Sequence, residues 1–175
     1  MRYRRAYHAG ATYFFTVNLA DRSLRLLVDH IDALRDAVRH VRRDHPFNII
    51  AWVVLPDHLH AIWQLPDGDA DFSTRWALIK ANFSRRVPTG ERIRDSRRQK
   101  GERGIWQRRF WEHLIRDDRD LQIHVDYIHF NPVKHGHARR VIDWEYSTFH
   151  HYVRLGWVTA DWGCDDGFDG DFGER

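Results

Sequence analysis

Two histidines separated by one residue, His58 and His60, are the first residues whose type and spacing could support chemistry. They lie in a strand-like run, HLHAIWQL, and side chains along a strand alternate between its two faces. Both imidazoles should therefore point to one face while Leu59 points into the core. Two neighbouring imidazoles suit a divalent metal ion, but histidines on a solvated strand face are common, so the pair alone leaves both interpretations open.

A second set of polar residues lies on a helix that we predict to begin after Asp117 or Asp118. The polar residues that share one face of this helix, at spacings of four, three and four, are Asp120, His124, Tyr127 and Asn131. The apolar stripe beside them, which should pack on a sheet, consists of Leu121, Val125 and Ile128. Tyr127 could act as a nucleophile, although the commoner role of such a tyrosine is to pack and donate one hydrogen bond.

The elements that must position these residues follow from hydrophobic periodicity. Strand-like runs cover residues 12–19, 47–55, 58–65 and 105–115, and Pro56-Asp57 between the second and third runs predicts a hairpin. Helical periodicity covers residues 29–44, a segment capped by Ser73, residues 118–131 and a short segment at 146–155. His45-Pro46 and Pro132 are the expected helix ends.

This order of elements predicts an α+β fold. We expect a ferredoxin-like, split βαβ antiparallel sheet with helices on one face, formed by residues 1–159 as one domain. Residues 85–103 are polar, mostly basic and interrupted by Pro88, Gly90 and Gly101, which predicts a mobile loop within that domain. Residues 160–175 form an acidic C-terminal tail.

Composition narrows the class of protein. The chain has 175 residues, 42% of them apolar, enough for one sizeable core. A single cysteine excludes an internal disulfide framework, and no apolar run approaches the ~20 residues of a membrane span, so we expect a cytoplasmic protein with no membrane contact. The acidic tail carries a net charge of −5, which leaves the remaining residues at +8. Such a charge suits a polyanionic partner, and an ordinary basic surface is the alternative.

Several longer motifs resemble those of REP-associated tyrosine transposases, which belong to the single-tyrosine HUH class. The three longest are LPDHLHAIWQLP at residues 55–66, GIWQRRFWEH at 104–113 and VDYIHFNPVKHG at 125–136. Shorter matches are YRR at 3–5, YFFTVNL at 13–19 and DFSTRW at 71–76. The resemblance therefore covers nearly the whole chain up to about Trp162.

The resemblance implies an HUH-endonuclease type of fold and a role for each candidate residue. His58 and His60 would be the ligands of a divalent metal, Mg²⁺ or Mn²⁺. Asn131 would supply a third ligand, and Tyr127 would be the nucleophile. The substrate would be single-stranded DNA folded into repetitive extragenic palindrome (REP) hairpins, cleaved and rejoined through a 5′-phosphotyrosine. The four-residue spacing of Tyr127 and Asn131 agrees, because it places both side chains on one helix face.

Other assignments stay open. His124 and His129 are candidate bases for the phenol proton, and the protein could be a monomer or a homodimer. Candidate phosphate contacts are Arg4, Arg5, Arg85, Arg86, Arg97, Arg98, Arg108 and Arg109. A non-catalytic module that binds single-stranded nucleic acid is the main alternative function, because a ferredoxin-like sheet with aromatic side chains can bind without chemistry. A hydrolytic metallonuclease is the second alternative.

Overall fold

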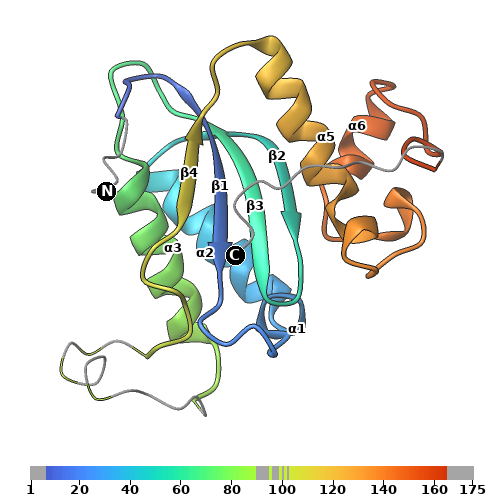
Figure 1. Cartoon of the computed structure of the whole chain (residues 1–175). Coiled ribbons are helices and arrows are strands. Elements are labelled where there is room, and N and C mark those ends of the chain that lie inside the picture. The colour runs from blue at the N-terminus through green and yellow to red at the C-terminus, as the bar shows by residue number, and fades with distance from the viewer. Residues whose placement is uncertain (1–6, 90–94, 96–98, 100, 102, 165–175) are drawn as a thin grey trace, which may run out of the picture.

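The computed structural model describes residues 7–89, 95, 99, 101 and 103–164 (Figure 1). Its strands are β1 (Thr12–Asn18), β2 (Asn48–Val54), β3 (His58–Gln64) and β4 (Trp111–Leu114). Its α-helices are α1 (Leu26–Asp29), α2 (Ile31–Asp44), α3 (Phe72–Arg86), α5 (Asp118–Lys134) and α6 (Phe149–Arg154), and η1 (Val141–Asp143) is a 3₁₀ turn. None of the helices in this described part of the chain is long and apolar enough to cross a membrane.

The four strands form one antiparallel sheet in the order β2-β3-β1-β4. Together with α2 and α3 this is the ferredoxin-like arrangement, so the predicted α+β class is confirmed. The predicted hairpin joins β2 to β3, and the Leu55 amide donates to the His58 carbonyl at 2.9 Å. In the register of β1 and β3, Thr16 lies opposite His60 and Asn18 opposite His58.

One face of the sheet packs against α2 and α3 and forms the larger core. The side chains that point to this face from β1 and β3 are Tyr13, Phe15, Val17, Leu59, Ala61 and Trp63. Trp63 stacks on Trp76 of α3 with ring centroids 4.1 Å apart, and neither side chain is exposed. Leu59 belongs to this core, as the strand alternation predicted.

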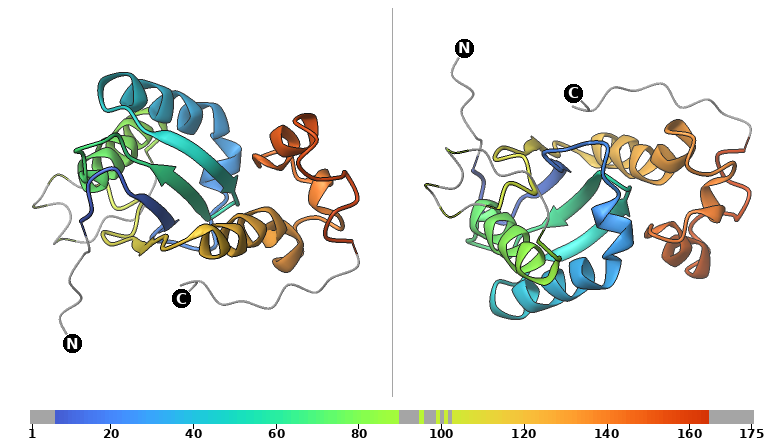
Figure 2. Two further views of the ribbon diagram at one scale, coloured as in Figure 1. Left: turned by 90° about the horizontal axis from the view of Figure 1, so that it is seen from above. Right: turned by 90° about the horizontal axis from the view of Figure 1, so that it is seen from below.

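The opposite face of the sheet is covered by α5, as Figure 2 shows from two directions. The expectation that helices cover one face holds for α2 and α3, whereas α5 lies on the other side. The physical reason is that this second face is also apolar, since Phe14, Ala51, Val53 and Ile62 point to it. Val125 and Ile128 of α5 bury that surface.

Several predicted elements differ from the observed ones in their bounds or caps, and three of these differences have a clear physical reason. Of the strand expected at residues 105–115, only β4 pairs with β1, because Trp106 forms an isolated bridge with Leu19 and a loop separates the two. The side chain of Asp71, not Ser73, caps α3 by accepting a hydrogen bond from the Thr74 amide at 2.9 Å. α5 continues through Pro132 to Lys134 although proline removes one helical hydrogen bond, and this end of the helix is held by Phe130 and Val133, which pack with Val141 and Phe149.

The segment after α5 attaches to the outer edge of β2. Thr148 donates its amide to the Trp52 carbonyl at 2.9 Å, and the Val54 amide donates to the Tyr146 carbonyl at 2.9 Å. Trp162 packs on Phe149 of α6 with ring centroids 5.9 Å apart. Residues 165–175 lie outside the described residues, so the boundary between a domain at 1–159 and a tail at 160–175 stays a prediction, as does the mobility of the 85–103 loop.

A buried arginine ties α3 to the end of α2. Arg75 is 2% exposed and pairs with both carboxylate oxygens of Asp69, at 2.6 and 3.1 Å. Its guanidinium also donates to the backbone carbonyls of His45, Pro46 and Asp71. The planar fork of an arginine can satisfy this many acceptors at once, which no other side chain can do.

We predict that Arg75→Met lowers the free energy of unfolding by about 3 kcal/mol, because it removes the ion pair of Asp69 and the side-chain donor to three backbone carbonyls. Urea unfolding of the purified chain measures this value. The control is Arg43→Met on α2, whose exposed side chain pairs only with neighbours, and we expect a change within about 0.5 kcal/mol. Equal losses for the two variants would contradict the assigned role of Arg75.

Candidate active site

The two histidines of β3 point to the face that α5 covers. His58 and His60 are 1% and 0% exposed, and their ring centroids lie 5.1 Å apart. Burial lowers the pKa of His58 and lowers that of His60 well below its usual value. Both imidazoles are therefore neutral at physiological pH, which is the form that binds a metal ion.

Each imidazole is oriented by a hydrogen bond at its Nδ1 atom. The Nδ1 of His60 lies 2.9 Å from the Thr16 hydroxyl oxygen on β1. The Nδ1 of His58 donates to Oδ1 of Asp57 at 2.8 Å. This leaves Nε2 as the outward atom of each ring, and the buried Nε2 of His58 has no hydrogen-bond partner in the described part of the chain. Such second contacts fix the tautomer of metal-binding histidines.

Asp57 is itself held in its charged form. Burial alone would raise the pKa of its carboxyl group, but hydrogen bonds from His58 and Arg22 more than offset that effect and hold the pKa far below its usual value. Arg22 reaches Asp57 through Nε and lies 3.3 Å from the Nδ1 of His58 through Nη2. The Asp57 carboxylate can therefore keep the His58 ring in place across the physiological pH range.

Tyr127 lies next to His60, one of the two histidines. Its ring centroid is 5.2 Å from that of His60, with the ring planes at 70°, and 6.0 Å from that of Phe14. Tyr127 is 1% exposed, and Nζ of Lys134 lies 4.8 Å from its ring centroid. The packing of Val125 and Ile128 on the sheet fixes the height of this helix above β3, so the Tyr127 ring contacts His60, whose ring neighbours that of His58.

The C-terminal end of α5 completes the site. Asn131 follows Tyr127 by one helical turn and is fully buried. His135, the C-cap residue of the helix, lies with its ring centroid 5.3 Å from that of His58. The structure thus brings together His58, His60 and Tyr127, with Asn131 one turn further along the same helix.

The two histidines considered as bases for Tyr127 have other contacts. His124 donates from Nδ1 to the Asp120 carbonyl at 2.7 Å, and its ring packs against Phe14. His129 lies 3.1 Å from the Thr148 hydroxyl through Nε2 and packs against Tyr152 of α6. His129 therefore faces the segment after α5, away from the β3 histidines.

A second cluster of potential metal ligands links β4 to the start of α5. Side-chain atoms of His113, Asp120 and His124 lie within 4.8 Å of one another. Asp120 accepts hydrogen bonds from Nε2 of His113 at 2.9 Å and from the Arg116 amide at 3.0 Å, so these groups already satisfy each other. We interpret the cluster as a clasp that fixes the first turn of the tyrosine-bearing helix.

The candidate phosphate contacts are only partly within the described residues. Arg4, Arg5, Arg97 and Arg98 lie outside them. Arg85 and Arg86 are exposed at the end of α3, and Arg108 and Arg109 are exposed in the loop before β4. None of these four contacts the β3 histidines, whereas Arg22, which sequence analysis missed, pairs with Asp57 and lies 3.3 Å from Nδ1 of His58.

Thr16 and Asp57 were also missed as site residues. Asp57 directly precedes His58 within the longest histidine motif, so its proximity could have been read from the sequence. Thr16 lies 44 positions before His60, and only the pairing register of β1 with β3 brings the two together.

Comparisons with known proteins agree on one family, although no protein-family model matches the chain. The REP-associated tyrosine transposase of Escherichia coli (strain K12) is 50% identical over 163 residues, which are 93% of this chain and 91% of that protein. A putative REP-associated tyrosine transposase of Haemophilus influenzae is 48% identical over 162 residues, 92% of each chain. A solved structure of the REP-associated tyrosine transposase bound to a REP hairpin matches with a TM-score of 0.84 and 47% identity, covering 99% of this chain and 95% of that one.

We predict that the Asp120 clasp makes stability depend on pH in the acid range. Burial alone would raise the pKa of Asp120, but hydrogen bonds from His113 and Arg116 outweigh it and lower the pKa to about 2. A depressed carboxyl pKa stabilises the fold above the unfolded-state value near 3.8, and that stability is lost as pH falls toward 2. Asp120→Asn should therefore cost about 2 kcal/mol at pH 7 and roughly half of that at pH 3. Urea unfolding of both proteins at the two pH values measures the difference, and a pH-independent difference would contradict this role.

Proposed function

This chain belongs to the REP-associated tyrosine transposases, and from that premise and the geometry of its site we propose that it cleaves and rejoins single-stranded DNA at REP hairpins with Tyr127 as nucleophile. The observation that carries the proposal is that the Tyr127 ring lies beside a pair of neutral imidazoles. Its centroid is 5.2 Å from that of His60, which is 5.1 Å from that of His58. A binding module without chemistry has no need for this arrangement on the buried face of its sheet.

The donor set fits a divalent metal ion, which the family implies. His58 and His60 are neutral, each ring is held at Nδ1, and the buried Nε2 of His58 has no hydrogen-bond partner among the described residues. We assign His58 and His60 as ligands, with the amide oxygen of Asn131 as the third. When bound, Mg²⁺ or Mn²⁺ neutralises phosphate charge and helps to align the phosphate for in-line attack.

Tyr127 supplies the bond-forming oxygen. Its phenol oxygen attacks the phosphorus of the scissile phosphodiester, the bond from phosphorus to the 3′-oxygen breaks, and the phenol loses its proton as the leaving 3′-oxygen gains one. The products are a 5′-phosphotyrosine and a free 3′-hydroxyl, so the number of phosphoester bonds is unchanged. Attack by another 3′-hydroxyl on the phosphotyrosine reverses the step and joins two strands.

The buried state of the site adds a requirement for substrate entry. Tyr127, His58 and His60 are each at most 1% exposed. A phosphate can reach them only after the residues that cover them move. His135, the C-cap residue of α5, lies against His58 and is one of the groups beside the site. The candidate contacts for the DNA phosphates are Arg4, Arg5, Arg85, Arg86, Arg97, Arg98, Arg108 and Arg109.

We predict that Tyr127→Phe abolishes the covalent protein–DNA adduct and leaves affinity for the hairpin within about twofold, because the substitution removes only the attacking oxygen. The measurement uses labelled single-stranded hairpin DNA with Mn²⁺ or Mg²⁺ and denaturing electrophoresis, beside binding by fluorescence anisotropy. Tyr152→Phe is the matched control, because the Tyr152 hydroxyl donates to the backbone carbonyl of Ile50 on β2 and not to a group of the site. An adduct that persists in Tyr127→Phe would refute the assignment, and products that form without any adduct in the wild type would indicate a hydrolytic nuclease.

We predict that Thr16→Val weakens Mn²⁺ binding by roughly 10- to 100-fold, because the His60 ring loses the hydrogen bond that fixes it. His60→Ala should abolish the same binding. Isothermal calorimetry with Mn²⁺ alone measures both without reference to activity. The control is Thr74→Val on α3, because Thr74 contributes its backbone amide to the helix cap and the substitution keeps that amide. Unchanged Mn²⁺ affinity in Thr16→Val and His60→Ala would place the metal elsewhere, with the His113 cluster as the next candidate.

A further inference from the structure

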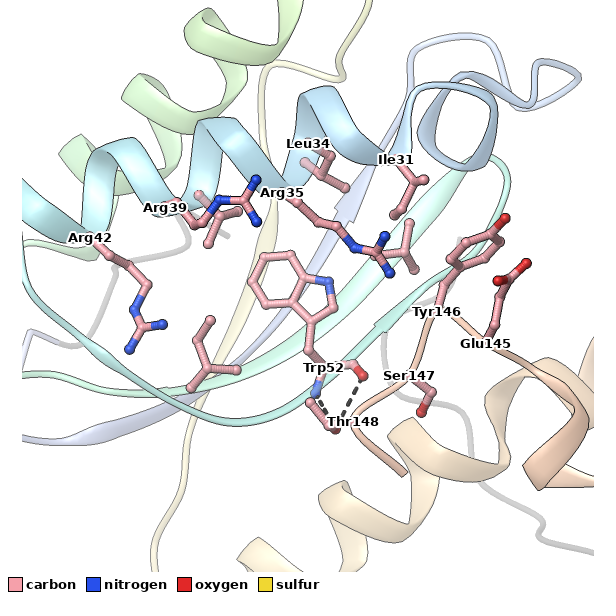
Figure 3. A pocket seen from close by; sticks show the side chains of 13 residues that line it. Ile31, Leu34, Arg35, Arg39, Arg42, Trp52, Glu145, Tyr146, Ser147 and Thr148 are labelled. Carbon is pink, nitrogen blue, oxygen red and sulfur yellow. Dashed lines mark hydrogen bonds between the residues drawn. The ribbon is translucent and has the colours of Figure 1, made fainter. Parts of the chain in front are cut away.

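A groove of about 360 Å³ lies between α2 and the edge strand β2 (Figure 3). Trp52, which lines it, packs with the core on the α2 face of the sheet, whereas Tyr127 belongs to the cluster on the opposite face. The floor of the groove is Trp52 with Ile49 and Val54, and one wall is the segment from Glu145 to Thr148. Figure 3 shows the Trp52 indole between α2 and this segment, whose Thr148 bonds the Trp52 backbone. We call this feature the α2–β2 groove.

The other wall of the groove is basic. Arg35, Arg39 and Arg42 recur at spacings of four and three along α2, and all three line the groove. Arg35 and Arg39 are 50% and 69% exposed in their side chains and pair with Asp32 and Asp36 on the same helix. Exposed pairs within one helix contribute little because water screens them, so phosphate oxygens can replace those carboxylates.

A continuous line of rings connects the groove to the metal-binding histidines. From His58 the path passes to His135 at 5.3 Å and on to His137 at 6.3 Å between ring centroids. It continues through Trp144 to Tyr146, with centroid separations of 5.5 Å at each step. At its end, the guanidinium carbon of Arg35 lies 6.0 Å from the centre of the Tyr146 ring.

The backbone explains why the path turns around the edge of the sheet. Val54, at the end of β2, pairs with Leu59, the residue between the two histidines. The Val54 amide donates to the Tyr146 carbonyl, and the Trp144 indole donates to the Val54 carbonyl at 2.9 Å. The edge of β2 therefore holds the aromatic segment beside both the histidine hairpin and the groove.

We propose that the α2–β2 groove binds the unpaired DNA strand that continues from the cleavage site beside the hairpin. This proposal rests on the function proposed above and adds the location of the single-stranded part of the substrate. Trp52 and Tyr146 would stack on unpaired bases, and Arg35 and Arg39 would bind the phosphates between them. A duplex cannot use these rings because its bases are already stacked and paired, so the occupant is a single strand.

The test compares a bare REP hairpin with the same hairpin carrying a single-stranded extension at its foot, in the uncleaving Tyr127→Phe background. The variant is Arg35→Gln/Arg39→Gln, and the matched control is Arg43→Gln, an exposed arginine of α2 outside the groove. We expect the double variant to bind the extended hairpin about tenfold more weakly than the Arg43→Gln control does. Both variants should bind the bare hairpin with equal affinity. Two lost phosphate contacts should also reduce the slope of log K against log salt by roughly 1.4 for the extended hairpin. Thermal unfolding checks that both variants fold.

A second readout locates the strand directly. 5-Iodouracil placed in the extension should crosslink to Trp52 or Tyr146 on irradiation. Mass spectrometry of the crosslinked peptides identifies the residue. Equal binding of the extended hairpin by the double variant and the control, or an equal loss with both DNAs, would overturn the groove assignment. Wild-type chain that still forms the Tyr127 adduct in that case would leave the proposed function intact. A wild-type chain that forms no adduct would overturn the proposed function and the groove assignment together.

Discussion

The packing of α5 across the second face of the sheet is the constraint on which the rest of the site depends. Val125 and Ile128 are held against Phe14 and Ile62 by burial of apolar surface, and this contact sets the distance from the middle of the helix to β3. The side-chain periodicities of the helix and the strand then determine which side chains meet between α5 and β3. A strand presents His58 and His60 together, and the helix presents Tyr127 above them.

Burying two imidazoles is costly unless they are neutral and hydrogen-bonded, and the fold satisfies both conditions before any metal binds. Desolvation lowers the pKa values of His58 and His60, and Thr16 and Asp57 hold the rings at Nδ1. Little reorganisation is then needed when a ligand arrives at Nε2, which is the usual advantage of a preorganised site. The same packing buries the site, so DNA can reach Tyr127 only after a conformational change.

The two faces of the ferredoxin-like sheet carry different features, the candidate catalytic groups on one face and the α2–β2 groove on the other. The α5 face carries the groups that would make and break bonds, and the α2 face carries a basic, aromatic groove. The edge of β2 joins them, because Trp144 and Tyr146 bond to Val54 while the ring of His137 leads back toward His58. Edge strands are open to pairing, and in this protein the segment after α5 occupies that position.

Sequence by itself determined the local features whose origin is periodicity. The alternation around Leu59 placed both histidines on one face, and the spacing from Tyr127 to Asn131 placed both residues on one helix face. The order of strands and helices predicted the α+β class, and long motifs indicated the family. Tertiary structure decided which face α5 covers, that Thr16 is the partner of His60, how Arg75 is satisfied, and that α5 continues past Pro132. These features depend on contacts between residues far apart in the chain, and local periodicity carries no information about such contacts.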